Sequence, residues 1–285
     1  MNRSFIQQYL LVVAGAALVV SLYFFGDTKS RPALTKPEAG NAGHVGKAVS
    51  MSFEKILSLA GNTLSAMQKD SVSILTNLVE KKSGAEKTSA IKKLAELWSR
   101  TENFIVSAHY FEEIAKLDST KDNWKIAGDY YYFGFSGTTD SAAKVFGGEH
   151  AVNCYAVASK FDSTDTKIKV LQALSWIDGV GGMNTMNGVL LLKEIEKTDP
   201  DNELMNVTLG RLAVVSGQYD KAIERLQRTI KLYPENTEAY FHLGEAYRAT
   251  GRKSDAVKMF EQCKKLESSP DFQKQLDDLI NQLKK

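Results

Sequence analysis

The stretch that decides the fold reads ELMNVTLGRLAVVSGQYDKAIERLQRTIKLYPEN (203–236) and continues as TEAYFHLGEAYRATGRKSDAVKMFEQCKKLESSP (237–270). The two segments are both 34 residues long and share one pattern. Five positions recur at this interval: Leu209 as Leu243, Gly210 as Gly244, Gly217 as Gly251, Ala222 as Ala256 and Leu226 as Phe260. A fixed period of this length in tandem indicates a stack of repeated structural units.

The recurring residues are those that a pair of packed helices requires. Gly210 and Ala222 are small, so the two helices of one unit can approach closely. Gly217 stands where the first helix must end and the chain must turn, and glycine tolerates the positive φ of such a position. Pro234 ends the second helix, because proline cannot continue it. One hairpin cannot bury its own apolar face, so the pattern predicts neighbouring hairpins on both sides.

The pattern resembles the tetratricopeptide repeat, strongly over 203–270 and more weakly over 87–202, and it does not extend to residues 1–83. The resemblance implies an all-α fold, a right-handed α-solenoid of about five helical hairpins over 85–270. It also implies that the chain binds other proteins. In this architecture the first helix of each hairpin lines the concave side.

Three further helix pairs are expected upstream of the two clear repeats. They comprise 87–100 with 103–117, a helix around 124–131 with one at 151–161, and 168–180 with 185–197. Gly128 and Ala151 are 23 positions apart, against 12 for Gly210 and Ala222. This excess predicts either longer helices or an insertion around 136–148.

Residues 4–26 carry no charged side chain. As a helix, this segment spans roughly 34 Å, which is enough to cross a bilayer. The sequence therefore predicts a transmembrane anchor at 1–26, in contact with the membrane through 9–25, followed by a flexible linker at 27–50 that is rich in Gly, Pro and Ala. The alternative is a cleaved secretory signal, but no Ala-x-Ala site comes after Phe25.

The charges that flank this segment do not fix its orientation. Arg3 stands on one side, and Lys29, Arg31 and Lys36 stand on the other, opposed by acidic residues. A signal-anchor with a short N-terminal tail commonly exports the domain on its C-terminal side, and similar anchored repeat proteins of bacterial envelopes face outward. We expect a single-pass protein of the bacterial inner membrane with a periplasmic domain, and a cytoplasmic domain is the alternative.

Residues 51–84 carry an apolar stripe with alternating spacings of four and three. Its members are Phe53, Leu57, Ala60, Leu64, Met67, Ser71, Ile74 and Leu78. Two interpretations remain open: a helical cap on the first repeat, or a short coiled coil that makes a homodimer. A homo-oligomeric structural membrane protein, assembled through the 53–78 helix, is accordingly the alternative function. Residues 271–285 show helical spacing with a charged opposite face, which predicts a C-terminal capping helix.

Composition and motifs favour a scaffold over an enzyme. The chain has 285 residues with a net charge of +2, so bulk charge does not favour nucleic acid as a partner. The glycine-rich run 179–182 is interpreted as a tight turn. His150 and Cys154 are too few ligands for a metal, and both cysteines fall on apolar helix positions. Glu112 and Glu113 are interpreted as a solvated helix face. We expect no cofactor, metal or catalytic residue.

The predicted binding surface is the concave side, at repeat positions 2, 5, 9 and 12 of the first helices. Its members are Lys125, Asp129 and Tyr132, then Val207, Arg211 and Val214, then Phe241, Glu245 and Arg248. This mixture suits a peptide or helix of a partner protein, held by apolar anchors and complementary charge. The double substitution Phe241→Ala and Arg211→Ala is expected to abolish partner capture without unfolding the domain.

Overall fold

A computed structural model describes residues 50–285, so the predicted anchor at 1–26 and nearly all of the predicted linker at 27–50 lie outside the described residues. The α-helices are α2 (Phe53–Asn62), α3 (Ala66–Lys81), α4 (Gly84–Arg100), α5 (Phe104–Leu117), α6 (Lys121–Gly137), α7 (Ser141–Phe161), α8 (Thr166–Leu174), α9 (Thr185–Thr198), α10 (Glu203–Val215), α11 (Tyr219–Leu232), α12 (Thr237–Ala249), α13 (Lys253–Leu266) and α14 (Pro270–Leu283). Residues 50–285 contain no strand, and none of their helices is long and apolar enough to cross a membrane.

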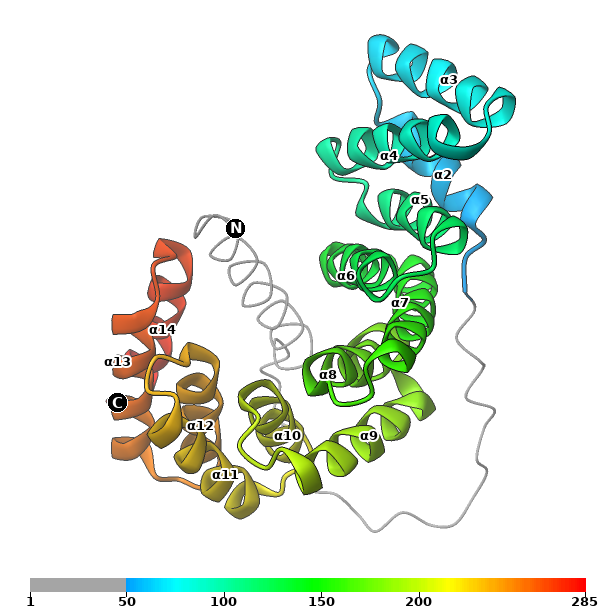
Figure 1. Ribbon diagram of the computed structural model, residues 1–285. Coiled ribbons are helices and arrows are strands. Elements are labelled where there is room, and N and C mark those ends of the chain that lie inside the picture. The colour runs from blue at the N-terminus through cyan, green and yellow to red at the C-terminus, as the bar shows by residue number, and fades with distance from the viewer. Residues whose placement is uncertain (1–49) are drawn as a thin grey trace, which may run out of the picture. The chain divides into compact units, whose positions relative to one another are not determined.

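The helices of the described chain pack as hairpins within two compact units, residues 50–186 and 187–285. In the first unit α4 packs on α5, α5 on α6 and α6 on α7. In the second unit α10 packs on α11, α11 on α12, α12 on α13 and α13 on α14 (Figure 1). The predicted all-α class is confirmed, and the helices of all five predicted pairs are present.

The tight crossings within the two clear repeats lie where the sequence predicts them. A Cβ atom built on Gly210 would stand 2.5 Å from Leu226 Cδ2, and one on Gly244 would stand 2.6 Å from Phe260 Cε1. Ala222 is fully buried at the first crossing. Glycine is therefore required at both positions, because any side chain would push the two helices of the hairpin apart.

The turns between the helices repeat as well. Gly217 and Gly251 have φ values of 76° and 75°, in the left-handed region that favours glycine. Asn202 and Asn236, 34 residues apart, cap the following helices: their Oδ1 atoms accept hydrogen bonds from the backbone N–H groups of Met205 (3.0 Å) and Ala239 (2.6 Å).

The predicted excess of residues around 136–148 is accounted for by long helices. α6 has 17 residues and α7 has 21, against 13 and 14 for α10 and α11. Only Thr138, Thr139 and Asp140 lie between α6 and α7, and Asp140 Oδ1 caps α7 by accepting from Ala142 and Ala143 N–H. The alternative of an inserted loop is therefore wrong.

The glycine-rich run 179–182 is only partly a turn. α8 continues into a π-helical segment, η1 (Ser175–Val180), and the chain then reverses at Gly181 and Gly182, with φ values of 64° and 57°, before the short 3₁₀ helix η2 (Gly182–Asn184). Gly179 has a different role: a Cβ on Gly148 of α7 would stand 2.6 Å from the Gly179 carbonyl carbon. The two backbones touch, which requires glycine on both sides.

The stripe at 53–78 is divided between two helices. α2 ends at Asn62, and α3 begins after the N-cap Ser65, whose side chain forms a capping box with Gln68. α2 packs on α5, where the ring of Phe53 stacks on His109 at 3.6 Å between centroids, whereas α3 packs on α4. The stripe therefore does not lie on one continuous helix, and whether α2 and α3 act as a cap or take part in a homodimer stays a prediction.

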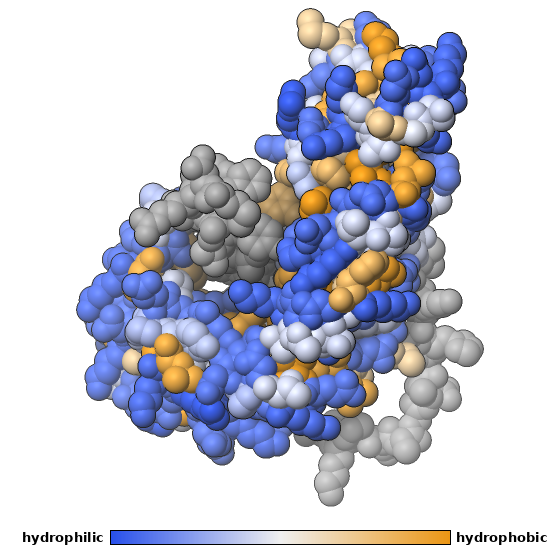
Figure 2. Space-filling model, in the orientation of Figure 1, coloured by the Kyte–Doolittle hydropathy of each residue, from blue (hydrophilic) through white to orange (hydrophobic). Residues whose placement is uncertain are grey.

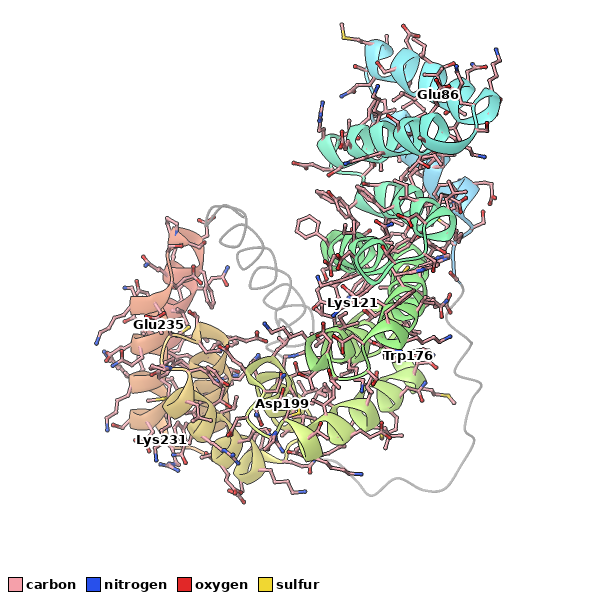
Figure 3. The ribbon with its side chains drawn as sticks, viewed as in Figure 1. Glu86, Lys121, Trp176, Asp199, Lys231 and Glu235 are labelled. Atoms are coloured by element: carbon pink, nitrogen blue, oxygen red, sulfur yellow. The ribbon has the colours of Figure 1, made fainter. Side chains whose placement is uncertain are left out.

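Ion pairs also join different helices. Lys121, labelled in Figure 3 at the start of α6, lies 2.9 Å from both Asp162 Oδ2 and Asp165 Oδ2 in the turn between α7 and α8. Lys264 of α13 contacts Asp277 of α14 at 2.6 Å. Ile280 and Leu276 of α14 are buried against the second unit's core, as expected of a terminal cap.

Candidate partner-binding surface

Six of the nine predicted surface residues lie on two helices that pack on each other, α10 and α12. They are Val207, Arg211 and Val214 on α10, and Phe241, Glu245 and Arg248 on α12. On each helix the three residues are separated by three or four positions, which places them on one face. The structure thus gathers these six residues in the second unit.

Val207 differs from the prediction because its side chain is only 1% exposed and belongs to the core of the second unit. Arg211 and Val214, one and two turns further along α10, are partly exposed. A ligand could therefore contact Arg211 and Val214 but not Val207. The periodicity of the repeat identified the helix face on which these residues lie, but it did not show which of them are buried and which are exposed.

The side chain of Phe241 is partly packed in the core and partly exposed to solvent. Its ring lies 5.9 Å from the ring of Phe260 on α13 and 5.8 Å from that of Phe272 on α14, measured between centroids. The residue remains partly exposed. Because the ring packs against two other helices, Phe241→Ala would disturb the domain, and Phe241 is a poor probe of ligand binding.

Glu245 and Arg248 form a two-point ion pair at the edge of α12. Arg248 Nε donates to Glu245 Oε1 at 3.1 Å, and Arg248 Nη2 donates to Glu245 Oε2 at 2.6 Å. The Glu245 side chain is mostly covered, whereas that of Arg248 is 40% exposed. Glu245 therefore orients the guanidinium group, and Arg248 is the charge that this edge offers to a ligand.

A second charged group of this surface lies in the first turn of α12. Glu238 Oε1 of α12 lies 3.5 Å from His242 Nε2. Burial raises the pKa of Glu238, but the electrostatic interactions with His242 and Arg211 outweigh this effect, and the pKa is lowered. Glu238 is therefore held as a carboxylate, and the charge of Arg211 reaches it across from α10.

The other three predicted residues lie on α6, in the first unit. Lys125 Nζ contacts Asp129 Oδ2 at 2.6 Å, and Asp129 Oδ1 also accepts a hydrogen bond from Tyr155 of α7 at 2.9 Å. Tyr132 is buried. These contacts engage the Lys125 ammonium group and both carboxylate oxygens of Asp129. The two side chains are still partly exposed, so they are the parts of α6 that a ligand could contact. The nine residues thus fall into two groups, one on each unit.

A buried carboxylate in the first unit was missed by the sequence reasoning. Glu112, interpreted as part of a solvated face, is only 8% exposed. Its Oε2 accepts from Tyr131 Oη at 2.8 Å and lies 2.9 Å from His150 Nδ1, and its Oε1 lies 3.0 Å from Lys116 Nζ. The signal was present: Ala108 and Ala115, four before and three after it, lie on the buried face of α5.

The surroundings of Glu112 keep it charged. Burial raises its pKa, but hydrogen bonds from His150 and Tyr131 and the contact with Lys116 more than reverse this, lowering the pKa from 4.5 to about 2. The same burial raises the pKa of the Cys154 thiol and of the Tyr131 hydroxyl. A carboxylate that already faces three donors is engaged in joining α5, α6 and α7 rather than open to a ligand.

Metal ligation is not indicated in the part of the chain from residue 50 onward. No group of three or more His, Cys, Asp or Glu side chains there could hold a metal ion. Cys154 and Cys263 are both buried, as predicted, and burial raises the pKa of Cys263 to about 12. His109 is half-buried and stacks on Phe53, and this burial lowers its pKa.

The match to a family model lies within the second unit. Residues 207–266 match the family model described as tetratricopeptide repeat. Among solved structures, a crystal structure of MamA is similar at a TM-score of 0.45 and 18% identity, covering 65% of this chain and 93% of that chain. A tetratricopeptide repeat protein from Parabacteroides merdae is similar at a TM-score of 0.45 and 12% identity, covering 81% and 98%.

A third solved structure is YrrB, described as a tetratricopeptide repeat protein with an unusual peptide-binding site. It is similar at a TM-score of 0.40 and 12% identity, covering 72% of this chain and 97% of that chain. No curated protein matches the chain significantly.

Proposed function

We propose that this chain, a tetratricopeptide repeat protein, is a non-enzymatic scaffold that binds an extended peptide or a helix of a partner protein. The binding surface is the exposed side of α10 and α12. A second, smaller contact region on α6 carries Lys125 and Asp129. The repeat family supports a role in protein–protein interaction, and the residues of α10 and α12 supply the chemistry.

The observation that carries the proposal is the arrangement of apolar and charged groups on this surface. Val214 and Phe241 are partly exposed apolar groups that can receive a partner's apolar side chains. Arg248 is held in place by Glu245 at the outer edge, and the Glu238 carboxylate lies within the influence of Arg211. Apolar anchors with charges of both signs around them suit a polypeptide with matching charges.

The proposed location is the bacterial inner membrane. The uncharged segment 4–26, with membrane contact through 9–25, supports a single-pass anchor, and export of residues 50–285 to the periplasm is the proposed topology. A reporter enzyme that is active only outside the cytoplasm, fused after Lys285, tests this. Activity in intact cells supports the topology, and a silent but intact fusion contradicts it.

The binding surface is tested by Arg211→Ala combined with Arg248→Ala in the full chain. Both side chains are at least partly exposed, so the fold should persist, which circular dichroism verifies. The control is Lys221→Ala with Lys231→Ala on α11, which removes the same charge from exposed positions on the second helix of the hairpin (Lys231 is labelled in Figure 3).

In cells expressing each variant, partners are cross-linked to the tagged chain and quantified by mass spectrometry. We expect the amount of at least one cross-linked partner to fall at least ten-fold in the α10–α12 variant, whereas the α11 variant retains this partner. Equal recovery of the same partners by both variants would show that the surface is assigned wrongly.

A further inference from the structure

The outer side of α3 leaves apolar side chains in solvent. Met67 is 79% exposed, Ile74 61% and Leu78 38%. None of the 16 residues of α3 is fully buried, although one side of the helix packs on α4. Figure 2 shows apolar side chains at the surface where α3 lies, at the top of the view. The terminal helix of a stack of repeats ordinarily presents a polar outer face, so this stripe is an exception.

The three exposed residues, together with the half-buried Ser71, have the spacing of a helix–helix seam. Met67, Ser71, Ile74 and Leu78 succeed one another at intervals of four, three and four residues. This spacing places them in one line along the helix, as positions a and d lie in a coiled coil. The preceding half of the stripe is used within the chain, since Ala60 and Leu64 are buried. The α3 stripe, residues 67, 71, 74 and 78, is the other half: Met67, Ile74 and Leu78 are exposed, and Ser71 is half-buried with its hydroxyl donating to Met67 O at 2.9 Å.

We propose that the α3 stripe pairs with the α3 stripe of a second copy of this chain, with the two helices antiparallel. In that arrangement Met67 faces Leu78 of the second copy, and Ile74 faces Ser71 of the second copy. A large side chain meets a small one at the centre, and two large ones meet at each end. Because the dyad repeats every contact, the stripe is complementary to itself.

The flanking residues favour the antiparallel pairing over the parallel one. On one flank of the antiparallel seam Asp70 meets Asn77 of the second copy, whose amide can donate to the carboxylate. In a parallel pair each seam residue meets its own copy, so two serines oppose each other in the seam and Asp70 lies beside the apolar Leu75. The charge and size patterns therefore select one orientation.

The association is expected to be weak because the buried interface is small. One pair of 16-residue helices buries less than the roughly 1,200 Å² at the low end of stable protein interfaces. Attachment of both copies to one membrane, as in the proposed location, would confine them to the same thin layer and raise their local concentration. The pairing goes beyond the scaffold function and does not depend on the α10–α12 surface.

The test uses the full chain in cells, with single cysteines introduced on α3. Ser71→Cys and Ile74→Cys are expressed separately and together, and disulfide-linked dimers are quantified after mild oxidation. The native Cys154 and Cys263 are buried and contribute little background. Ser58→Cys, at an exposed position of α2 outside the stripe, measures random collision.

We expect the co-expressed pair to give at least five-fold more dimer than either variant alone or than Ser58→Cys. Adding Met67→Asp to both chains should abolish this excess, and because Met67 is largely exposed the fold should be kept. Three results would overturn the proposal: no excess in the mixed sample, more dimer from Ser71→Cys alone than from the mixture, or an excess that survives Met67→Asp.

Discussion

Gly210 lies directly against Leu226, so that a Cβ atom at position 210 would stand 2.5 Å from Leu226 Cδ2. The same relation recurs one repeat later between Gly244 and Phe260. The two helices of each hairpin are thus held by one small residue against one large residue, at a constant interval. The contact buries the side of the first helix that faces the second helix of the same hairpin.

We predict that Gly210→Ala destabilises the second unit. The added methyl group cannot fit without moving Leu226, and overpacking of this kind costs about 1–3 kcal/mol. Urea denaturation should show the loss as a lower midpoint. Gly61→Ala in α2 is the control, since no atom lies within 4 Å of a Cβ there and alanine favours the helix. Equal midpoints for the wild type and Gly210→Ala would contradict the close crossing.

Replacement of Glu112 by glutamine should destabilise the first unit. The substitution keeps the shape but removes the charge that faces Tyr131, His150 and Lys116, and unsatisfied buried groups cost about 1–3 kcal/mol. Glu113→Gln is a neighbouring control, because Glu113 is 42% exposed and its ion pair with Lys116 lies at the surface, where such pairs contribute about 0–1 kcal/mol. If the two substitutions have the same effect on thermal unfolding, the buried role of Glu112 is refuted.

The contribution of Glu112 should depend on pH in a defined window. Its pKa is lowered from 4.5 to about 2 by folding, so the folded state binds fewer protons there. The carboxylate therefore stabilises the fold fully above pH 4.5, and this stabilisation is lost as the pH falls toward 2. The stability difference between wild type and Glu112→Gln should shrink over this window. A difference that stays constant from about pH 5 to about pH 2.5 would exclude the mechanism.

Two arginines of α11 should differ in their effect on stability. Arg225 donates to Glu196 of α9 and to Asn206 of α10, and its side chain is mostly covered. Arg225→Ala should cost about 1.5–3 kcal/mol, as expected for hydrogen bonds to charged groups. Arg228 pairs with Asp201 at the surface, so Arg228→Ala should cost less than about 1 kcal/mol. Chemical denaturation of both variants measures the difference, and the reverse order would contradict it.

The parts of the fold that depend on local spacing could be predicted from the sequence. The recurrence of Gly210 as Gly244 indicated the crossings, and Gly217 and Pro234 indicated the ends of the helices. The distance from Gly128 to Ala151 showed that residues were in excess but not that they would extend two helices. The backbone contact of Gly148 with Gly179 joins positions 31 residues apart, and no local pattern reports it.

The sequence predicted which helix faces carry the candidate surface, but it did not predict which residues on those faces are buried. Helical periodicity places Val207 and Arg211 on one face, yet Val207 is in the core because α11 and α12 close over it. The burial of Glu112 was not predicted because a carboxylate on a helix is ordinarily solvated. Its three hydrogen-bond donors come from three different helices, α5, α6 and α7. Which side chains of different helices come together depends on the packing of those helices, and the residue spacing along one helix does not determine this packing.

Site-specific photo-cross-linking tests the central claim most directly. A photoreactive amino acid is placed at Val214 or Arg248, on the exposed side of α10 and α12, and at Lys231 on α11 as the control, in the full chain in cells. We predict that positions 214 and 248 give the same partner adduct and that position 231 does not. Adducts of equal yield from all three positions, or an adduct from position 231 alone, would contradict the assignment of the binding surface to α10 and α12.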